Sequence, residues 1–134
     1  MDSAKYYLRS ESFNWSTGSG QQVVTLQKDK SSSSMLWQVQ EAYGEKVCKA
    51  GRPVKCGETI RLLHVQTKKR LHSHSIPSVL SKQQEVSAFG DAGESRSEGG
   101  DQSDDWKVLC GKHFWTKGDA IRLQHVVTDA FLSR

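Results

Sequence analysis

The side chains with the most chemical potential lie in one short string, Leu71-His72-Ser73-His74, where a hydroxyl stands between two imidazoles. A hydroxyl activated by an imidazole is the nucleophile of many hydrolases, and paired imidazoles form half of many zinc sites. Along a strand, however, alternation sends His72 and His74 to one face and Ser73 to the other. The spacing therefore argues against a direct Ser–His contact, and the sequence identifies no third or fourth zinc ligand.

Other catalytic patterns are weaker still. Asp104 and Asp105 are adjacent at the start of an expected strand, and we interpret them as a solvent-exposed turn rather than an acid–base pair. The sequence contains no glycine-rich phosphate loop and no Cys-x-x-Cys motif. We therefore predict no catalytic residue, no cofactor and no bound metal.

A repeat explains two more of the five histidines. At one constant offset, the segment that begins at Gly57 matches the segment that begins at Gly118 without a gap. The identical pairs are Gly57 and Gly118, Ile60 and Ile121, Arg61 and Arg122, Leu62 and Leu123, His64 and His125, Val65 and Val126, Thr67 and Thr128, and Leu71 and Leu132. A repeat of this period indicates one structural unit per copy. Because a fold repeat rarely duplicates a catalytic residue, we expect His64 and His125 each to cap a strand or to bond a backbone carbonyl within its own unit.

The repeat unit has the pattern of a β-hairpin. Residues 60–65 alternate as a half-buried strand, residues 66–69 are polar and can turn, and a second strand starts at Leu71. Further matches appear upstream, where Gln21-Gln22-x-Val repeats Gln83-Gln84-x-Val, and Leu36-Trp37-x-Val resembles Asp105-Trp106-x-Val. These matches predict one domain over residues 1–134 with three units, at about 5–47, 52–112 and 113–134. The first unit lacks its opening strand, and the third lacks its second half.

Composition narrows the class of partner. The chain has 134 residues, a net charge of +4 and 35% hydrophobic residues. No run of about 18 apolar residues occurs, so we expect no membrane span. The one basic cluster, Lys68-Lys69-Arg70, suits a solvated hairpin tip better than a nucleic-acid surface, so we expect no nucleic-acid partner. The Gly-rich polar loop over residues 90–104 is expected to be mobile and to hold no rigid site.

The three cysteines leave alternatives open. Cys48 and Cys56 flank a segment with a Gly and a Pro that can turn back, so the two thiols can form a disulfide in an oxidising compartment. The alternative is a pair of free thiols, one of them buried. Cys110 follows a strand and is expected to be a core or rim thiol.

The four tryptophans fall into two pairs, one repeated between units and one not. Trp37 and Trp106 occupy equivalent places in two units and are expected in the core. Trp15 and Trp115 have no equivalents. Each either packs at the core or rim, or forms an exposed aromatic platform for a sugar or an extended peptide.

The second unit carries the sharpest binding candidates, because guanidinium, imidazole and amide groups gather on its hairpin and the following loop. We predict ligand-binding roles for Arg70, His72, His74, Gln83, Gln84, Glu85 and Trp115. The glutamine pair also occurs in the first unit as Gln21 and Gln22, which favours a structural requirement for that pair.

Several sequence strings in the repeat units resemble those of one protein family. The relevant strings are Leu71-His72-Ser73-His74, Gln84-Glu85-Val86-Ser87-Ala88-Phe89-Gly90, Asp105-Trp106-Lys107-Val108 and Gly18-Ser19-Gly20-Gln21-Gln22-Val23-Val24-Thr25. Over residues 5–132 the chain resembles MIR-domain proteins of the stromal cell-derived factor 2 type. The resemblance implies an all-β fold, a β-trefoil built from three MIR motifs.

The same resemblance implies a function. It implies a non-catalytic role in the endoplasmic reticulum lumen, beside a DnaJ-type co-chaperone and Hsp70, in quality control of unfolded or O-mannosylated secretory proteins. Two alternatives follow from the wider family. One is a mannose-type lectin domain, and the other is a detached accessory domain of a protein O-mannosyltransferase.

Overall fold

The chain folds into β-strands and two short 3-10 turns, which confirms the predicted all-β class. The computed structural model describes residues 6–28, 33–77, 83–90, 95–96 and 98–133. Its elements are β1 (Tyr7–Asn14), β2 (Gln22–Gln27), η1 (Ser33–Met35), β3 (Trp37–Glu41), β4 (Thr59–His64), β5 (Arg70–Pro77), β6 (Gln84–Phe89), η2 (Gln102–Asp104), β7 (Trp106–Leu109) and β8 (Arg122–His125). The predicted hairpin is β4–β5. Among the described residues, no helix is long and apolar enough to cross a membrane.

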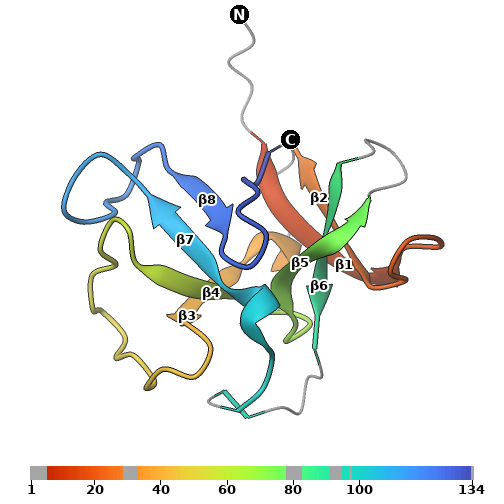
Figure 1. Cartoon of the computed structure of the whole chain (residues 1–134), viewed down its shortest axis with the longest axis horizontal. Helices are drawn as coiled ribbons and strands as arrows, with labels where there is room; N and C mark the ends of the chain where they lie inside the picture. Colours follow the sequence, from red (N-terminus) through yellow and green to blue (C-terminus); the bar gives the residue numbers. More distant parts are fainter. Residues whose placement is uncertain (1–5, 29–32, 78–82, 91–94, 97, 134) are drawn as a thin grey trace, which may run out of the picture.

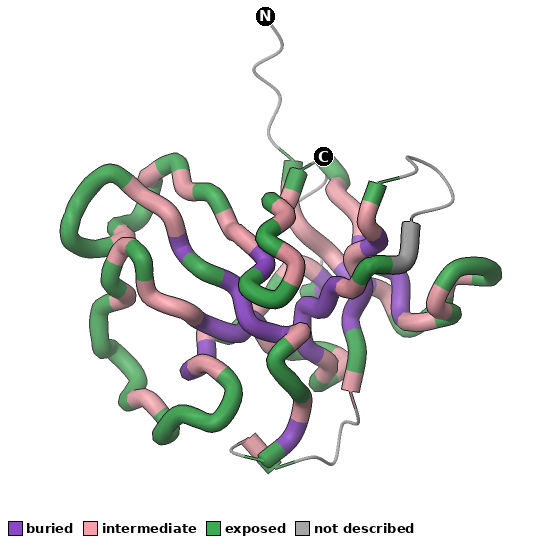
Figure 2. Tube along the Cα trace, in the orientation of Figure 1, coloured by how far each residue is buried: buried purple, intermediate pink, exposed green. Residues whose placement is uncertain are grey.

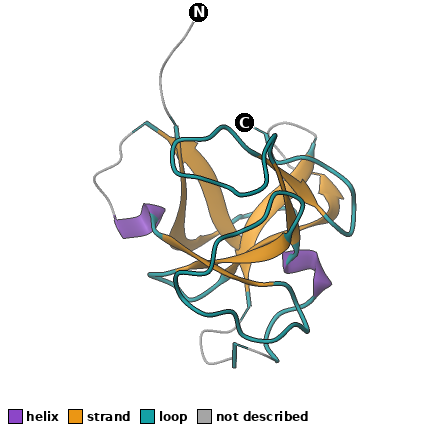
Figure 3. Ribbon diagram, turned by 90° about the vertical axis from the view of Figure 1, so that its left-hand side faces the viewer, coloured by secondary structure: helices purple, strands orange, loops and turns teal. Residues whose placement is uncertain are grey.

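The strands pair antiparallel in the order β1-β2-β6-β5-β4-β7-β8, and β3 joins as a further partner of β4 (Figure 1). Strand β4 is the centre of this arrangement, because it pairs with β3 along its length, with β7 near Ile60 and with β5 at Leu63. The start of β1 and the last described residues lie at the same end of the molecule (Figure 1). Figure 3 shows the two 3-10 turns separated across the strands.

A small apolar core lies where the strands cross, in purple in Figure 2. Its buried members are Val24, Ile60, Leu62, Leu71, Ala88, Trp106 and Val108. Trp106 is 1% exposed, and Trp37 packs partly buried against the same cluster. The predicted core role of both tryptophans is therefore confirmed. Their indole N–H groups are satisfied in equivalent ways, by the carbonyls of Leu8 (from Trp37) and Leu71 (from Trp106), each at 3.0 Å.

Much of the interior is polar, and Arg61 shows how it is accommodated. Arg61 is fully buried and donates to the backbone carbonyls of Glu41, Gly99 and Arg96 at 2.8, 2.9 and 2.9 Å. Burial and the nearby Arg70 lower the pKa of Arg61. Since a buried charge is tolerated only when it is hydrogen-bonded, this guanidinium fixes the segment before η2 against β3 and β4. The prediction that residues 90–104 hold no rigid structure is wrong for the described part of that loop, and residues 91–94 and 97 lie outside the described residues.

Neither alternative for Cys48 and Cys56 is correct, because they neither bond each other nor are both free, and the expectation that Cys110 is a thiol is also wrong. The bridge joins Cys56 to Cys110, whose Cα atoms are 5.2 Å apart, and Cys48 is a free thiol. Long-range pairing explains the difference, because the amide of Gly57 donates to the carbonyl of Val108 at 2.6 Å. This contact sets the end of β7 beside residue 56. The backbone N–H of Cys48 instead donates to Glu41 at 3.2 Å.

Candidate functional site

Two hydrogen-bonded networks with the same design tie the hairpins to neighbouring strands. In the first network, Gln22 Nε2 donates to Ser10 Oγ at 2.8 Å and to Thr67 Oγ1 at 2.9 Å. His64 Nδ1 lies 2.7 Å from Thr67 Oγ1, and its Nε2 lies 2.7 Å from the Ser34 carbonyl. Because a carbonyl only accepts, Nε2 carries the proton and Nδ1 accepts from the Thr67 hydroxyl. A neutral imidazole therefore satisfies every partner.

The second network repeats this arrangement further along the chain. Gln84 Nε2 donates to Ser73 Oγ at 2.6 Å and to Thr128 Oγ1 at 2.8 Å. His125 Nδ1 lies 2.8 Å from Thr128 Oγ1, and its Nε2 lies 2.7 Å from the Ser103 carbonyl. Burial lowers the pKa of His125, with the nearby His72 and His74 acting in the same direction and the Ser103 carbonyl opposing.

The two networks settle several candidate residues. His64 and His125 are structural and each bonds a backbone carbonyl, as predicted. The expectation that this carbonyl lies within the same unit is wrong, because Ser34 and Ser103 belong to 3-10 turns in the preceding predicted unit. Ser73 donates its hydroxyl proton to the Glu85 carbonyl at 2.7 Å, so an imidazole does not activate it. Gln84 is committed to the second network. The second glutamine of each pair, Gln22 or Gln84, thus serves the fold in the same way.

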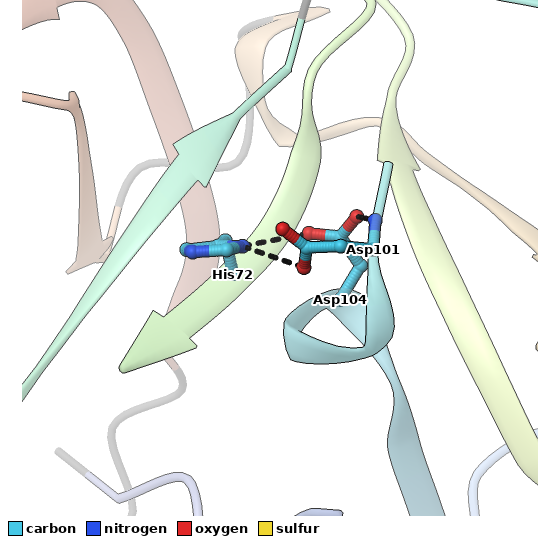
Figure 4. A group of neighbouring side chains, drawn as sticks. All are labelled: His72, Asp101 and Asp104. Atoms are coloured by element: carbon cyan, nitrogen blue, oxygen red, sulfur yellow. Dashed lines mark hydrogen bonds and ion pairs between the residues drawn. The ribbon is translucent and has the colours of Figure 1, made fainter. Parts of the chain in front are cut away.

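A second group of side chains, which we name the His–carboxylate cluster, contains His72, His74, Glu85, Asp101 and Asp104. His72 Nδ1 lies 2.8 Å from Asp104 Oδ1, and His74 Nε2 lies 3.1 Å from Glu85 Oε2. The two imidazole rings are 5.3 Å apart and meet edge to face, which confirms that they share one face of β5. Figure 4 shows His72 pointing at both Asp101 and Asp104.

The two aspartates of the cluster come from η2, and sequence reasoning missed them. Asp101 caps the turn by accepting from the Ser103 amide at 2.8 Å, and Asp104 Oδ2 accepts from the Asp101 amide at 2.9 Å. Asp104 is 1% exposed, and Asp105 is buried too, so the predicted solvent-exposed turn is wrong. Burial raises the pKa of Asp105 although the Tyr43 amide donates to it. The Asp-x-x-Asp spacing of a capping box was the available signal.

Glu85 links the cluster to the loop between β1 and β2. It is 3% exposed and accepts hydrogen bonds from the hydroxyl and the amide of Ser19. Gly18 leaves room for this contact, because a Cβ atom on it would lie 2.5 Å from Glu85 Oε1. Its φ of +68° also favours glycine.

A groove of about 810 Å³ runs between β1, β2, β6 and the segment after β8. Its apolar lining includes Leu8, Trp15, Val24, Val86, Phe131 and Leu132, and its polar lining includes Gln83, Gln84 and Glu85. The indole N–H of Trp15 is buried and has no hydrogen-bond partner among the described residues. An unpaired buried donor is costly to the fold.

The predicted binding residues therefore fall into separate places. Gln83, Gln84 and Glu85 line the groove, and His72 and His74 lie in the His–carboxylate cluster, which Glu85 connects to the groove. Arg70 is 4% exposed, and its Nε donates to the Gln40 side chain at 3.3 Å. Trp115 packs partly buried against the core and does not line the groove. Trp15, which sequence reasoning left open, lines the groove together with Phe131.

Comparison with known proteins agrees with this architecture. The family model described as "MIR domain" matches residues 6–134. Mouse stromal cell-derived factor 2 is 43% identical over 126 residues, which are 94% of this chain and 57% of that protein. Human stromal cell-derived factor 2-like protein 1 is 44% identical over 126 residues, which are 94% of this chain and 54% of that protein. The chain thus spans little more than half the length of these curated relatives.

Two solved structures are similar to the described fold. The SDF2-like protein from Arabidopsis thaliana superposes with a TM-score of 0.85 at 37% identity, covering 96% of this chain and 69% of that one. The S. cerevisiae protein O-mannosyltransferase Pmt1-Pmt2 complex, bound to its sugar donor, gives 0.74 at 30% identity, covering 92% of this chain and 18% of that one. These likenesses support the trefoil-like β fold.

Proposed function

Since this chain belongs to the MIR-domain family and to its stromal cell-derived factor 2 type, we propose that it is a non-catalytic binding module of the endoplasmic reticulum lumen. In this proposal it holds unfolded or O-mannosylated secretory proteins beside a DnaJ-type co-chaperone and Hsp70. The partners come from the family resemblance, and the groove supplies the contact with the client protein.

The groove beside Trp15 is the observation that carries the proposal. An unfolded protein exposes apolar side chains and unpaired backbone carbonyls. The groove offers apolar walls at Leu8, Val24 and Leu132, and the indole of Trp15, whose buried N–H a peptide carbonyl would satisfy once the side chain turns to expose it. Gln83 at the polar side carries an amide group of the kind that bonds backbone amides and carbonyls. An extended apolar peptide fits these features.

The polar side chains support binding rather than turnover. Ser73 and His125 are both held in the second network by fixed partners. The acidic groups nearest to an imidazole, Asp104 and Glu85, are also bonded to backbone N–H groups. A nucleophile or general base must be free to contact a substrate, and these groups instead bond other parts of the protein.

The disulfide supports the proposed compartment. Disulfides persist in oxidising compartments such as the endoplasmic reticulum lumen. The Cys56–Cys110 bridge closes a span of 54 residues and joins segments that backbone hydrogen bonds already hold together. A chain built around such a bridge is suited to the secretory pathway.

A mannoside ligand is the second candidate, because Trp15 stands beside Gln83 and Glu85. An indole face next to amide and carboxylate groups is a common platform for sugar rings. The similarity to a domain of an O-mannosyltransferase complex bound to a sugar donor favours the same ligand class.

A binding experiment separates these ligands. We expect a fluorescently labelled, permanently unfolded protein to bind the purified chain and to lose affinity several-fold with Trp15→Phe, which removes the indole N–H and keeps a ring. The matched control, Trp115→Phe, lies away from the groove and should bind as the wild type does. Phe131→Ser should also weaken binding, whereas Val127→Ser, at a 52% exposed position, should not.

The outcomes are distinct. Equal binding by the Trp15 and Trp115 variants would refute the groove as the client site. Saturable binding of methyl α-mannoside that Trp15→Phe removes, without binding of the unfolded protein, would favour the lectin alternative. Binding of purified lumenal DnaJ-type co-chaperone, measured by analytical ultracentrifugation, tests the adaptor role separately.

A further inference from the structure

We propose that His72, Asp101 and Asp104 form a site for one divalent transition-metal ion of the zinc class. The three side chains converge from β5 and from the η2 segment (Figure 4). One nitrogen and two carboxylate oxygens are a donor set that zinc accepts, with a water molecule as the fourth ligand.

The distances suit such an ion. His72 Nδ1 lies 2.8 Å from Asp104 Oδ1 and 3.9 Å from Asp101 Oδ1, and the three donor atoms all lie within 4.8 Å of one another. Tetrahedral zinc with ligands at about 2.0–2.2 Å holds its donor atoms roughly 3.3 Å apart. The observed spacings lie on both sides of this value. Binding therefore requires His72 and Asp104 to separate by about half an ångström and Asp101 to move inward.

Both carboxylates are already oriented by the backbone. Asp101 Oδ1 accepts from the Ser103 amide at 2.8 Å, and Asp104 Oδ2 accepts from the Asp101 amide at 2.9 Å. Asp104 Oδ1 is therefore the oxygen that faces His72. Hydrogen bonds of this kind fix the ligands of protein metal sites and raise their affinity.

The three side chains differ in solvent exposure in a way that suits ion binding. The side chains of His72 and Asp104 are 6% and 2% exposed, whereas that of Asp101 is 56% exposed. An ion can thus arrive at Asp101 and be held by the two buried donors. Without an ion, the proton on His72 Nδ1 provides the contact with Asp104, so ion binding displaces that proton.

Two arginines set the charge of the surroundings. A Cβ atom on Gly100 would lie 3.3 Å from Nη1 of both Arg61 and Arg70, and 2.4 Å from Asp104 Oδ2. Both guanidinium groups therefore lie close to the backbone of Gly100, which the Asp104 carboxylate also approaches. They compensate part of the carboxylate charge, so we expect micromolar rather than nanomolar affinity. A nitrogen donor and three protein ligands also disfavour calcium, which takes six or more oxygens.

An independent observation is that the fold does not require these residue types. The Leu8 and Leu71 carbonyls accept from equivalent tryptophans, so the next residues, Arg9 and His72, occupy equivalent places on β1 and β5. At this place β5 carries the imidazole of His72, whereas β1 carries the guanidinium of Arg9. The hairpins form in both cases.

The same comparison applies to the turns. The Ser34 and Ser103 carbonyls accept from His64 and His125 in the two networks. The next residues, Met35 and Asp104, are therefore equivalent, and both end a 3-10 turn. A methionine at the equivalent place is also compatible with a 3-10 turn, so the turn can form without a carboxylate at this position.

Titration of the whole purified chain with zinc chloride tests the proposal, with the cobalt(II) absorption spectrum as a second readout. We expect one ion per chain and tetrahedral cobalt bands. Asp101→Asn keeps the capping oxygen but removes the charged ligand, and should weaken binding at least tenfold. Asp129→Asn, which removes an equal charge from an exposed turn, should leave binding unchanged.

Other zinc donors are separated by variants and by the assigned imidazole. His113→Gln and Cys48→Ser remove two further donor side chains and should leave the stoichiometry at one. Zinc should shift the ¹⁵N resonance of His72 Nδ1 in the folded wild-type chain, so the readout survives if His72→Gln fails to fold. Equal affinity of the wild type and Asp101→Asn, absence of binding at 100 μM zinc, or calcium binding of equal strength would each overturn the site.

Discussion

The contacts inside the two networks are repeated in the chain, whereas the residues beside the networks are not. Ser10, Gln22 and His64 hold the first network with the same atoms that Ser73, Gln84 and His125 use in the second. The residues next to these identical contacts differ in type between the two networks. The first network adjoins Arg9 and Met35 at the places where the second adjoins His72 and Asp104.

This difference separates structural from functional candidates. Side chains present in both networks satisfy backbone groups that every hairpin of this fold exposes. Side chains present in only one are not needed to form the hairpin and are available for another role. The His–carboxylate cluster belongs to the second kind, whereas the Cys56–Cys110 bridge is also unrepeated but serves the fold.

The disulfide gives the largest expected effect. Cys110→Ser should lower the free energy of unfolding by about 4 kcal/mol, because the bridge removes chain entropy from the unfolded state over a span of 54 residues. Urea unfolding monitored by tryptophan fluorescence measures the change. Cys48→Ser replaces the free thiol and should change stability by less than about 0.5 kcal/mol. A large loss in Cys48→Ser with little loss in Cys110→Ser would mean that Cys56 pairs with Cys48 in solution.

The next largest effect on stability is expected from the two hydrogen-bonded networks. His64→Ala and His125→Ala should each cost about 2–4 kcal/mol, because each removes two hydrogen bonds and leaves a buried carbonyl unsatisfied. The two losses should agree within about 1 kcal/mol if the networks are equivalent in energy as well as in geometry. Urea unfolding of both variants under one buffer condition makes the comparison. A large loss in one variant only would show that the repetition is geometric alone.

Repetition also explains how far the sequence predicts the structure. The hairpin, the core tryptophans and the structural histidines follow from patterns within short segments that occur twice. The Cys56–Cys110 bridge does not, because it depends on β7 returning to residue 56. The His72–Asp104 contact joins residues that are 32 apart, and local composition made the loop that carries Asp104 look unstructured. Contacts formed once, over long separations, leave no periodic signal.

A pH experiment probes the second network in its surroundings. Because the folded chain holds the pKa of His125 below its ordinary value of 6.5, the unfolded chain takes up this proton first. The stabilising contribution of neutral His125 is full above pH 6.5 and is lost as the pH falls from 6.5 towards the lowered pKa. We expect the free energy of unfolding to fall between pH 7.5 and 5.5, and His125→Gln should reduce this dependence.

An acidic group provides the control for this window. Burial alone would raise the pKa of Glu41, but hydrogen bonds from Arg96 and from backbone groups hold it at about 2. Glu41 therefore stabilises the fold above pH 4.5 and loses that contribution only between pH 4.5 and 2. Urea unfolding at several pH values separates the two ranges. A decline between pH 7.5 and 5.5 that persists undiminished in His125→Gln would assign the effect to another group.

The smallest expected effect tests whether Asp101 serves the fold or a ligand. Asp101→Asn retains an oxygen that accepts from the Ser103 amide, and the side chain is largely exposed. Without added metal, its free energy of unfolding should therefore stay within about 0.5 kcal/mol of the wild type. Added zinc should raise the melting temperature of the wild type and of Asp129→Asn, but not that of Asp101→Asn, because only an ion that binds the folded state stabilises it. A loss of several kcal/mol without metal would mean that the Asp101 charge is part of the fold, and would remove the contrast between repeated and unrepeated residues at this position.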